Sequence, residues 1–229
     1  MLGTKHTILF FLAFFLTIFL VTIIGIIFSP FINNISDYIY YNIVSPILFT
    51  FYFFTFIAFQ GIIRKIYTNK YINENQILIK SKAKKFQINE KLLIYLVIIL
   101  IYFSSMIRNF SIQSITLPKV LLFILSIIII EIALKFSSKS LYGYFTKDYI
   151  IISGIDLRIS LPIIYGSNIL NDSNVYTYND IKEYFTFPET IELYLIGEQG
   201  KLVFNTDNEL SRQFLGILKQ KKIPMKKFN

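Results

Sequence analysis

The sequence contains no cysteine and no tryptophan, and its only histidine is His6. The absence of cysteine excludes a disulfide framework, a thiolate nucleophile and a cysteine zinc site. A single histidine without clustered carboxylates cannot build an ordinary metal site. We therefore expect no metal and no other cofactor, and we interpret His6 as a polar residue at a membrane interface.

Motifs of the common enzyme classes are missing as well. The chain has no Walker A loop, no G-x-S-x-G elbow, no H-E-x-x-H and no G-x-G-x-x-G, and the acidic residues after residue 140 are scattered through predicted turns. Each of these motifs supplies a backbone geometry or a pair of groups that its chemistry needs. We therefore expect no catalytic residues and a non-enzymatic protein.

Charged residues are scarce and unevenly placed. They make up 16% of the chain, whereas 54% of it is hydrophobic, and soluble domains carry roughly 25% charged residues. Residues 1–139 hold 13 Lys or Arg and 4 Asp or Glu, which accounts for the net charge of +9, and residues 140–229 hold 10 of each. A nucleic-acid-binding module would carry its excess on the soluble part. We expect no nucleic-acid partner and interpret the charge as the positive-inside bias of a membrane protein.

Four apolar runs predict four transmembrane helices. The first has 21 residues without a charge, from Ile8 to Phe28, enough to span a hydrocarbon core of ~30 Å at ~1.5 Å per residue. It is longer than the apolar region of a cleaved signal peptide, the competing interpretation, and no A-x-A site follows it. The other runs are residues 46–63, 92–107 and 120–134. The last two are short, and a re-entrant pair is the alternative to two full spans.

The connecting segments predict the orientation. Residues 64–91 carry 8 Lys or Arg against two acids, whereas residues 29–45 carry Asp37 and no positive charge. Basic loops stay in the cytoplasm, so we expect loop 64–91 and both ends of the chain to lie inside. The heavy use of Ile, Asn, Lys, Phe and Tyr resembles that of AT-rich bacterial genomes, and we therefore expect a multi-pass protein of a bacterial cell membrane.

Past Ser140 the apolar runs become short and strand-like, with turn residues between them. We therefore divide the chain into a four-helix membrane domain, residues 1–139, and a cytoplasmic α+β domain, residues 140–229. The antiparallel strands of the second domain are expected at residues 142–146, 149–153, 158–165, 175–178, 183–187, 191–196 and 202–204. Pro162 suggests an edge or a bulge in the third of these.

One C-terminal helix is expected to cover this sheet. Thr206 and Glu209 match a capping box, in which each side chain satisfies a free backbone N–H group. An apolar face at helical spacing follows, made of Leu210, Phe214, Ile217 and Leu218. The pattern predicts a sheet or partial barrel closed by this helix.

Three segments carry a resemblance to a known fold: YGYFTKDYIIISG, VYTYNDIKEYFTFPETIELYLI and GKLVFNTDNELSRQFLGIL. They resemble the bacterial PH-like domains found at the cytoplasmic end of small multi-helix membrane proteins, the YcxB-like and related families. The resemblance covers at most residues 140–223, and Tyr178 stands where family members usually carry tryptophan. It implies a PH-like partial barrel and, because the families are described by their fold, no activity.

A basic cluster beside the membrane is a candidate for lipid binding. It consists of Lys80, Lys82, Lys84 and Lys85. Lysines near a membrane surface attract anionic lipid at roughly 1 kcal/mol each. The alternative, compatible with the first, is that the cluster only fixes the topology.

Glu131 is the one acid inside an apolar run. Lys135 lies four residues further on, a spacing that favours a helical ion pair. We predict an ion pair between Glu131 and Lys135 near the headgroups. A proton or ion site is the alternative, because ionisable groups inside membranes are candidates for function.

Three functional hypotheses follow. The preferred one is a non-enzymatic membrane protein whose C-terminal domain, residues 140–229, binds a protein, a peptide or lipid headgroups at the inner membrane face. Membrane lipids, anionic ones among them, are the expected partners. The second is a small transport-associated, bacteriocin-immunity or stress protein that acts through its transmembrane bundle. The third is a membrane enzyme that acts on lipids.

Overall fold

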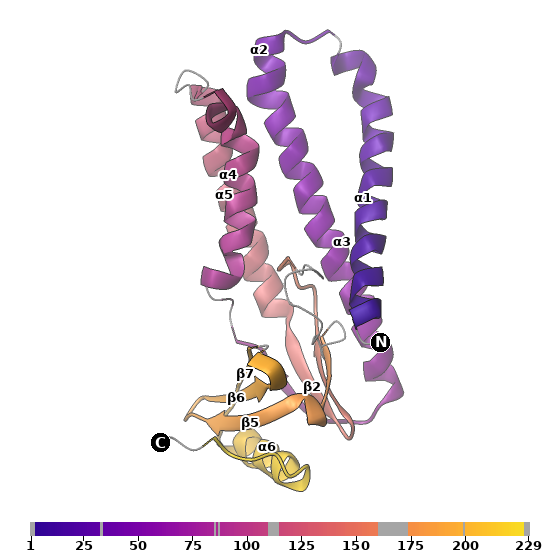
Figure 1. Cartoon of the computed structure of the whole chain (residues 1–229), viewed down its shortest axis with the longest axis vertical. Helices are drawn as coiled ribbons and strands as arrows, with labels where there is room; N and C mark the ends of the chain where they lie inside the picture. Colours follow the sequence, from indigo (N-terminus) through magenta and orange to yellow (C-terminus); the bar gives the residue numbers. More distant parts are fainter. Residues whose placement is uncertain are drawn as a thin grey trace.

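The computed structural model describes residues 3–32, 34–84, 86, 88–109, 115–159, 174–198 and 200–226. It has a helical bundle at one end and two β-sheets at the other (Figure 1). Three helical segments are long and apolar enough to cross a membrane: Thr7–Ile32, Asp37–Glu74 and Leu117–Ser140. Three of the four predicted runs therefore lie in such segments, and the run at 92–107 lies in a further helix that packs beside them.

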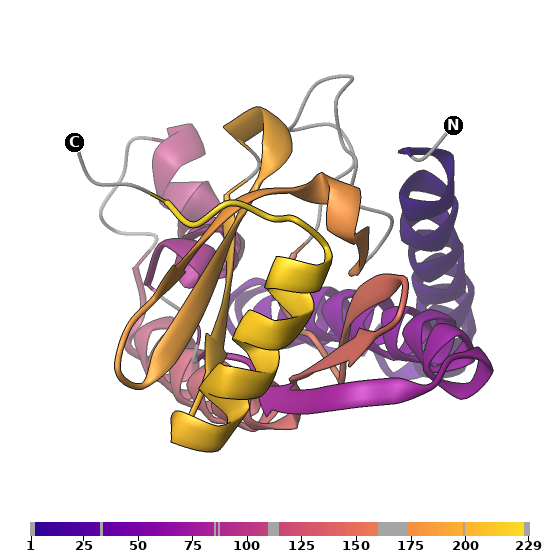
Figure 2. The ribbon, with the colours of Figure 1, turned by 90° about the horizontal axis from the view of Figure 1, so that it is seen from below.

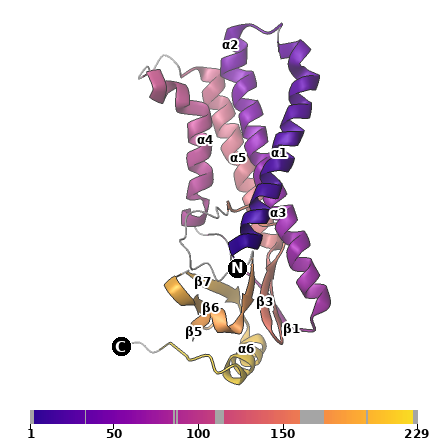
Figure 3. The same ribbon diagram turned by 45° about the vertical axis from the view of Figure 1, so that its right-hand side comes forward.

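The bundle consists of α1 (Gly3–Ile32), α3 (Ser45–Glu74), α4 (Ile88–Asn109) and α5 (Leu117–Ser140). Two short helices, α2 (Asp37–Ile39) and the π-helical η1 (Tyr40–Val44), lead into α3. Helix α1 packs along α3, and α4 packs along α5 (Figures 1 and 3). The start of α1 lies at the same end of the bundle as the sheets (Figure 1).

Helices α3, α4 and α5 share an apolar interior. It contains side chains that are at most 1% exposed: Ile57, Ile94, Ile98, Ile130 and Leu134. Leu157, from the loop after the second strand of a β-hairpin, closes this cluster at the sheet end. The bundle and the sheets therefore share packed side chains.

The strands form two antiparallel sheets. The first has the order β1 (Ile77–Lys82), β2 (Tyr142–Thr146), β3 (Tyr149–Ser153), β4 (Val175–Thr177), and the second has the order β5 (Ile181–Thr186), β6 (Thr190–Leu195), β7 (Lys201–Asn205). Single helical turns, η3 (Tyr178–Asp180) and η4 (Ile196–Glu198), precede β5 and follow β6. Just past β1, Ala83 bridges to Phe204 of β7, and the Lys84 N–H donates to the Val203 oxygen at 3.0 Å. These contacts join the two sheets at one side, and the described strands do not close into a barrel.

Residues 64–91 are not the loop that the charge pattern predicted. Helix α3 continues to Glu74, and β1 then pairs with β2, Ile77 opposite Thr146 and Lys82 opposite Tyr142. The hairpin of α4 and α5 is thus inserted between two neighbouring strands of one sheet. Residues 140–229 do not contain the whole sheet that the sequence placed there, because its first strand comes from before the hairpin.

The structure confirms strands at 142–146 and 149–153 and finds the four later strands within two residues of their expected ends. The predicted strand at 158–165 is different. Residues 158 and 159 are not in a strand, and the remainder of that segment, with Pro162, lies outside the described residues.

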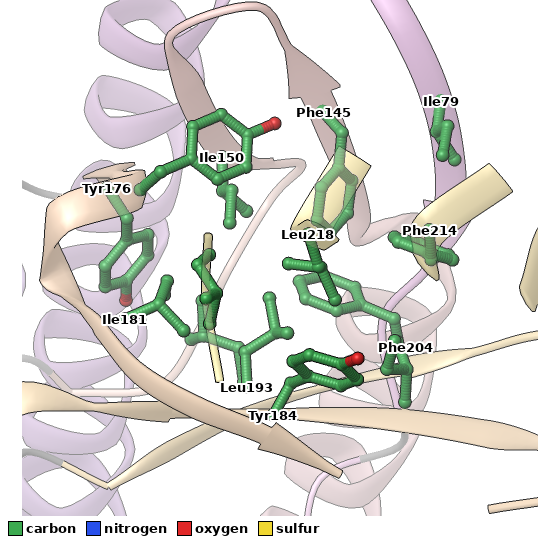
Figure 4. Close-up of a cluster of buried hydrophobic side chains, with 14 of the residues drawn as sticks. Ile79, Phe145, Ile150, Tyr176, Ile181, Tyr184, Leu193, Phe204, Phe214 and Leu218 are labelled. Atoms are coloured by element: carbon green, nitrogen blue, oxygen red, sulfur yellow. The ribbon is translucent and has the colours of Figure 1, made fainter. Parts of the chain in front are cut away.

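Helix α6 (Asn208–Gln220) lies between the second sheet and β1 (Figure 2). Its Phe214 and Leu218 are fully buried, and the Phe214 ring centroid lies 4.5 Å from that of Phe145, which in turn lies 5.0 Å from that of Phe204 (Figure 4). A Cβ atom at Gly143 would come within 2.2 Å of the Phe204 ring, so only glycine fits there. The predicted apolar face of the helix is confirmed, with Leu210 and Ile217 partly buried at its margins.

The cap of α6 differs from the prediction. Asp207 is the N-cap residue, and its Oδ1 accepts hydrogen bonds from the N–H groups of Glu209 at 3.0 Å and Leu210 at 2.8 Å. Among the described residues, Thr206 has a buried hydroxyl without a hydrogen-bond partner. Two adjacent residues suit a cap equally well by type, and the backbone path after β7 selects the second.

Candidate functional site

Four charged residues meet where the bundle joins the sheets. We call Arg64, Glu90, Asp156 and Arg158 the charged joint. Arg64 comes from α3, Glu90 from the first turn of α4, and Asp156 and Arg158 from the loop after β3. None of these four residues was predicted as a site residue from the sequence.

The loop that carries Asp156 is tied to the end of α5. Gly154 has φ of 145°, which favours glycine, and a Cβ atom there would lie 2.3 Å from the Ser140 main-chain oxygen. The Ser137 hydroxyl donates to the Ile155 oxygen at 2.7 Å and accepts from the Leu157 N–H at 3.0 Å. These contacts hold the loop against the helix and turn Asp156 inward.

Asp156 and Arg158 form a forked ion pair within this loop. The Arg158 Nη2 lies 2.8 Å from Asp156 Oδ2, and its Nε lies 3.0 Å from Oδ1. The Asp156 side chain is 1% exposed. Burial alone would raise the pKa of Asp156, but the charges of Arg158 and Arg64 and the hydrogen bonds from Arg158 hold that pKa well below its usual range.

Arg158 connects the loop to α4. Its Nη1 pairs with Glu90 Oε1, and its guanidinium carbon lies 4.7 Å from the centre of the Phe86 ring. Burial alone would lower the pKa of Arg158, but Asp156 and then Glu90 raise it above its ordinary value. These two carboxylates therefore favour the charged form of the guanidinium.

Arg64 connects the loop to α3, mainly through the main chain. Its Nη2 donates to the main-chain oxygens of Asp156 at 2.6 Å and Arg158 at 2.8 Å, and its Nη1 lies 3.7 Å from Asp156 Oδ2. One turn earlier, a Cβ atom at Gly61 would lie 2.8 Å from the Asp156 oxygen. Glycine at 61 therefore lets α3 approach the loop closely enough for Arg64 to reach both carbonyl groups.

The contact between α3 and β3 continues past the charged joint, toward the C-terminal end of α3. The Thr68 hydroxyl donates to Ser153 Oγ at 2.8 Å, and Ser153 donates to Asn69 Oδ1 at 3.0 Å. Two positive and two negative charges balance within the joint, and its buried groups are paired with one another. Such a neutral, mutually satisfied cluster binds protein elements together and leaves no charge over for a ligand.

The structure separates the predicted basic cluster. Lys80 and Lys82 lie on β1 with exposed side chains, and Lys84 follows the strand and is held by β7 through its main chain. Lys85 lies outside the described residues. The described lysines of the cluster therefore lie on β1 and just after it. Of these, Lys80 and Lys82 share one face of the strand.

Lys80 and Lys82 stand opposite two tyrosines. Lys80 pairs in register with Tyr144, and Lys82 pairs with Tyr142. The Lys80 Nζ lies 4.6 Å from the centre of the Tyr142 ring and 5.4 Å from that of Tyr144, within the range of cation–π attraction. We call Lys80, Lys82, Tyr142 and Tyr144 the lysine–tyrosine face.

Glu131 has a different partner from the one predicted. Both Glu131 and Lys135 lie in the described part of the chain, and there the Glu131 carboxylate pairs with Lys91 of α4, Nζ to Oε2 at 3.0 Å, while Lys135 is exposed. The neighbouring helix brings a lysine closer than the helix's own next turn does. The pair joins α4 to α5.

The middle of the bundle carries one small polar group. The Tyr102 hydroxyl lies 2.7 Å from Ser126 Oγ, and the Thr50 hydroxyl donates to it at 3.3 Å. Between this group and the charged joint lies the apolar interior of α3, α4 and α5. In the described residues, no three His, Cys, Asp or Glu side chains are grouped closely enough to hold a metal ion.

No protein-family model matches the chain, and no curated protein matches it.

Proposed function

We propose that this chain is a non-enzymatic integral membrane protein whose two-sheet module binds a protein, a peptide or a lipid headgroup at the inner membrane face. The observation that carries this proposal is the charged joint together with the inserted hairpin. The sheet is attached to α3 by Arg64, to α4 by Arg158 and to α5 by direct continuation into β2. A module held at three points has a fixed position relative to the membrane, as a binding surface directed at that membrane requires.

The helix directions support four spans. Helices α1, α3 and α5 are each long and apolar enough to cross, and the start of α1 lies at the sheet end (Figure 1). Because α3 and α5 both end at the sheets, a return crossing between them would fall to α4, which packs along α5. The positive-inside bias of residues 64–91 supports a cytoplasmic sheet end.

The strand arrangement supports a PH-like module. Four antiparallel strands, then three, then one amphipathic helix packed on their shared core agree with the fold that the sequence resemblance implies. The hairpin of α4 and α5 would be an insertion between the first two strands of that fold.

The packing of the bundle favours a function of the two-sheet module over a transport function of the helical bundle. Transport needs polar groups or water along a path across the membrane. Here the polar group at Tyr102 is separated from the charged joint by isoleucine and leucine side chains that are at most 1% exposed. Glu131 is paired with Lys91 near the sheet end. The second hypothesis, a protein that acts through its bundle, therefore has less support.

Cysteine labelling tests the location of the module. The chain has no cysteine, so Ser36→Cys before α2 and Lys182→Cys on β5 each give a single reactive thiol. A membrane-impermeant maleimide should label Ser36→Cys in intact spheroplasts. It should label Lys182→Cys only after the spheroplasts have been permeabilised. Labelling of Lys182→Cys in intact cells would refute the proposed orientation. Proton or potassium flux into proteoliposomes above that of protein-free vesicles would instead favour the bundle hypothesis.

A further inference from the structure

The lysine–tyrosine face is an open surface of the first sheet. Ile79, Ser81, Gly143 and Phe145, which alternate with its residues, are all buried. Because side chains alternate across a strand, Lys80 and Lys82 lie on the opposite side from the core. Helix α3 covers the same side at β3, where Tyr71 contacts Tyr149 with ring centroids 5.7 Å apart. Within the described residues, Lys80 and Lys82 on β1 stay exposed on this side.

The charge of this face is not neutralised. Within the described part of the chain, neither Lys80 nor Lys82 has a carboxylate within ion-pair distance. Tyr142 and Tyr144 are half-buried. Tyrosine presents an apolar ring and a polar hydroxyl, which suits a boundary between apolar and wet surroundings. Unpaired ammonium groups flanked by such rings fit an anionic partner near a membrane.

The face lies close to the membrane because β2 follows α5 almost at once. From Lys135, where the apolar run has ended, to Ser140 the helix advances ~7.5 Å at ~1.5 Å per residue, and Leu141 and Tyr142 add ~7 Å at ~3.3 Å per residue. Tyr142 and its neighbour Lys82 thus lie at most about 15 Å beyond the hydrocarbon edge, since any tilt shortens this distance. The headgroup layer of ~5–7 Å and one Debye length of ~8 Å cover about the same distance.

We propose, building on the function proposed above, that the lysine–tyrosine face binds the phosphate groups of anionic lipids in the same membrane leaflet. Lys82 lies nearer to the membrane and reaches back to the headgroups with its flexible stem. Lys80 lies two residues earlier on β1, farther from the membrane, and is oriented by the two tyrosine rings. The partner is the membrane of the protein itself, because the charged joint holds the face at this distance and prevents it from turning toward a second membrane.

The test uses the full-length protein in nanodiscs. A fluorophore on Leu78→Cys, an exposed position of the same strand, reports quenching by spin-labelled headgroups. Anionic spin-labelled lipid should quench it more than neutral lipid, and the difference should shrink as salt is raised. Lys80→Gln with Lys82→Gln should reduce the preference for anionic lipid by up to about thirtyfold, since each lysine contributes up to ~1 kcal/mol near the surface and ~1.4 kcal/mol is a factor of ten.

A matched variant controls for the loss of charge. Arg212→Gln with Lys219→Gln removes two positive charges from exposed positions of α6, at the end of the module away from the bundle (Figure 1). It should keep the anionic preference. Equal quenching by anionic and neutral lipid, or equal effects of the two double variants, would overturn the lipid proposal. Because cysteine labelling tests the inner location separately, that outcome would leave the proposed function standing with a protein or peptide as the ligand.

Discussion

Arg64 donates a hydrogen bond of 2.6 Å to the main-chain oxygen of Asp156, across 92 residues of sequence. The same guanidinium nitrogen reaches the Arg158 oxygen at 2.8 Å. A planar arginine fork aims several N–H groups in fixed directions, whereas lysine has one point charge on a flexible stem. The contact therefore ties α3 to the loop after β3 in one defined geometry.

Removing the charge of Asp156 should destabilise the whole molecule. Asp156→Asn leaves the buried Arg64 and the half-buried Arg158 with only Glu90 as a counter-charge, and breaking a buried ion pair costs ~3–5 kcal/mol. Thermal unfolding of the purified protein in detergent should show a large drop in the melting temperature. The control is Glu183→Gln, because Glu183 pairs with Lys226 at 3.8 Å near the surface, where a pair contributes ~1 kcal/mol or less. Equal losses for the two variants would show that the joint does not hold the parts together.

The pH dependence of stability should follow from the same carboxylate. The folded-state pKa of Asp156 is depressed, and its unfolded value is ~3.9. Its contribution is therefore fully present above pH ~4 and is lost as the pH falls from there through the lower folded-state value. We expect the melting temperature of the wild-type protein to fall more steeply below pH ~4 than that of Asp156→Asn. Parallel acid profiles of the two proteins would contradict this assignment.

Substitutions in the cap of α6 and on its buried face should lower the free energy of unfolding by different amounts. Phe214→Ala leaves a cavity beside Phe145 and Phe204 and should cost ~3–5 kcal/mol. Asp207→Ala removes the cap and should cost ~1 kcal/mol. Thr206→Ala serves as the matched control, because its hydroxyl makes no hydrogen bond among the described residues, so it should cost less than Asp207→Ala. Urea unfolding followed by circular dichroism measures all three, and a larger loss for Thr206→Ala than for Asp207→Ala would restore the capping box expected from the sequence.

The module should fold without the membrane when β1 is returned to it. The Ala83 N–H donates to the Leu141 oxygen at 3.2 Å, so a short glycine-rich turn can replace the hairpin and join residues 75–84 to residues 141–226. We expect this fusion to be soluble and to unfold cooperatively. Residues 140–229 alone should be less stable, since they leave the edge of β2 and the side of Phe145 uncovered. Equal stability of the two would mean that β1 is dispensable.

The sequence predicted those elements whose evidence is local. The apolar runs showed α1, α3 and α5 as membrane helices, alternation and turn residues showed β2 and β3, and helical spacing showed the buried face of α6. Each of these signals is contained in a window of ten to twenty residues, because it reflects the period of one element against one apolar surface.

The sequence could not predict contacts between distant segments. Strand β1 was not predicted from the sequence, because its partner β2 lies beyond two further helices. The charged joint assembles residues from three separate elements. In the sequence, Arg64 follows an apolar run, and such an arginine is equally typical of a residue that only determines membrane topology. The pairing of Glu131 with Lys91 was not predicted for the same reason. Spacing along the chain does not indicate which helix packs alongside.

The inserted hairpin also sets an order of events during synthesis. About 60 residues separate Lys82 from Tyr142, and at ~5–20 residues per second the ribosome needs roughly 3–12 s to make them. During that time β1 has no neighbouring strand β2 to pair with, while α4 and α5 are being synthesised. Charged side chains on a strand discourage pairing with other chains, so Lys80 and Lys82 protect β1 during the wait. The first sheet can therefore form only after the whole hairpin has been synthesised, because β1 and β2 lie on opposite sides of it in the sequence.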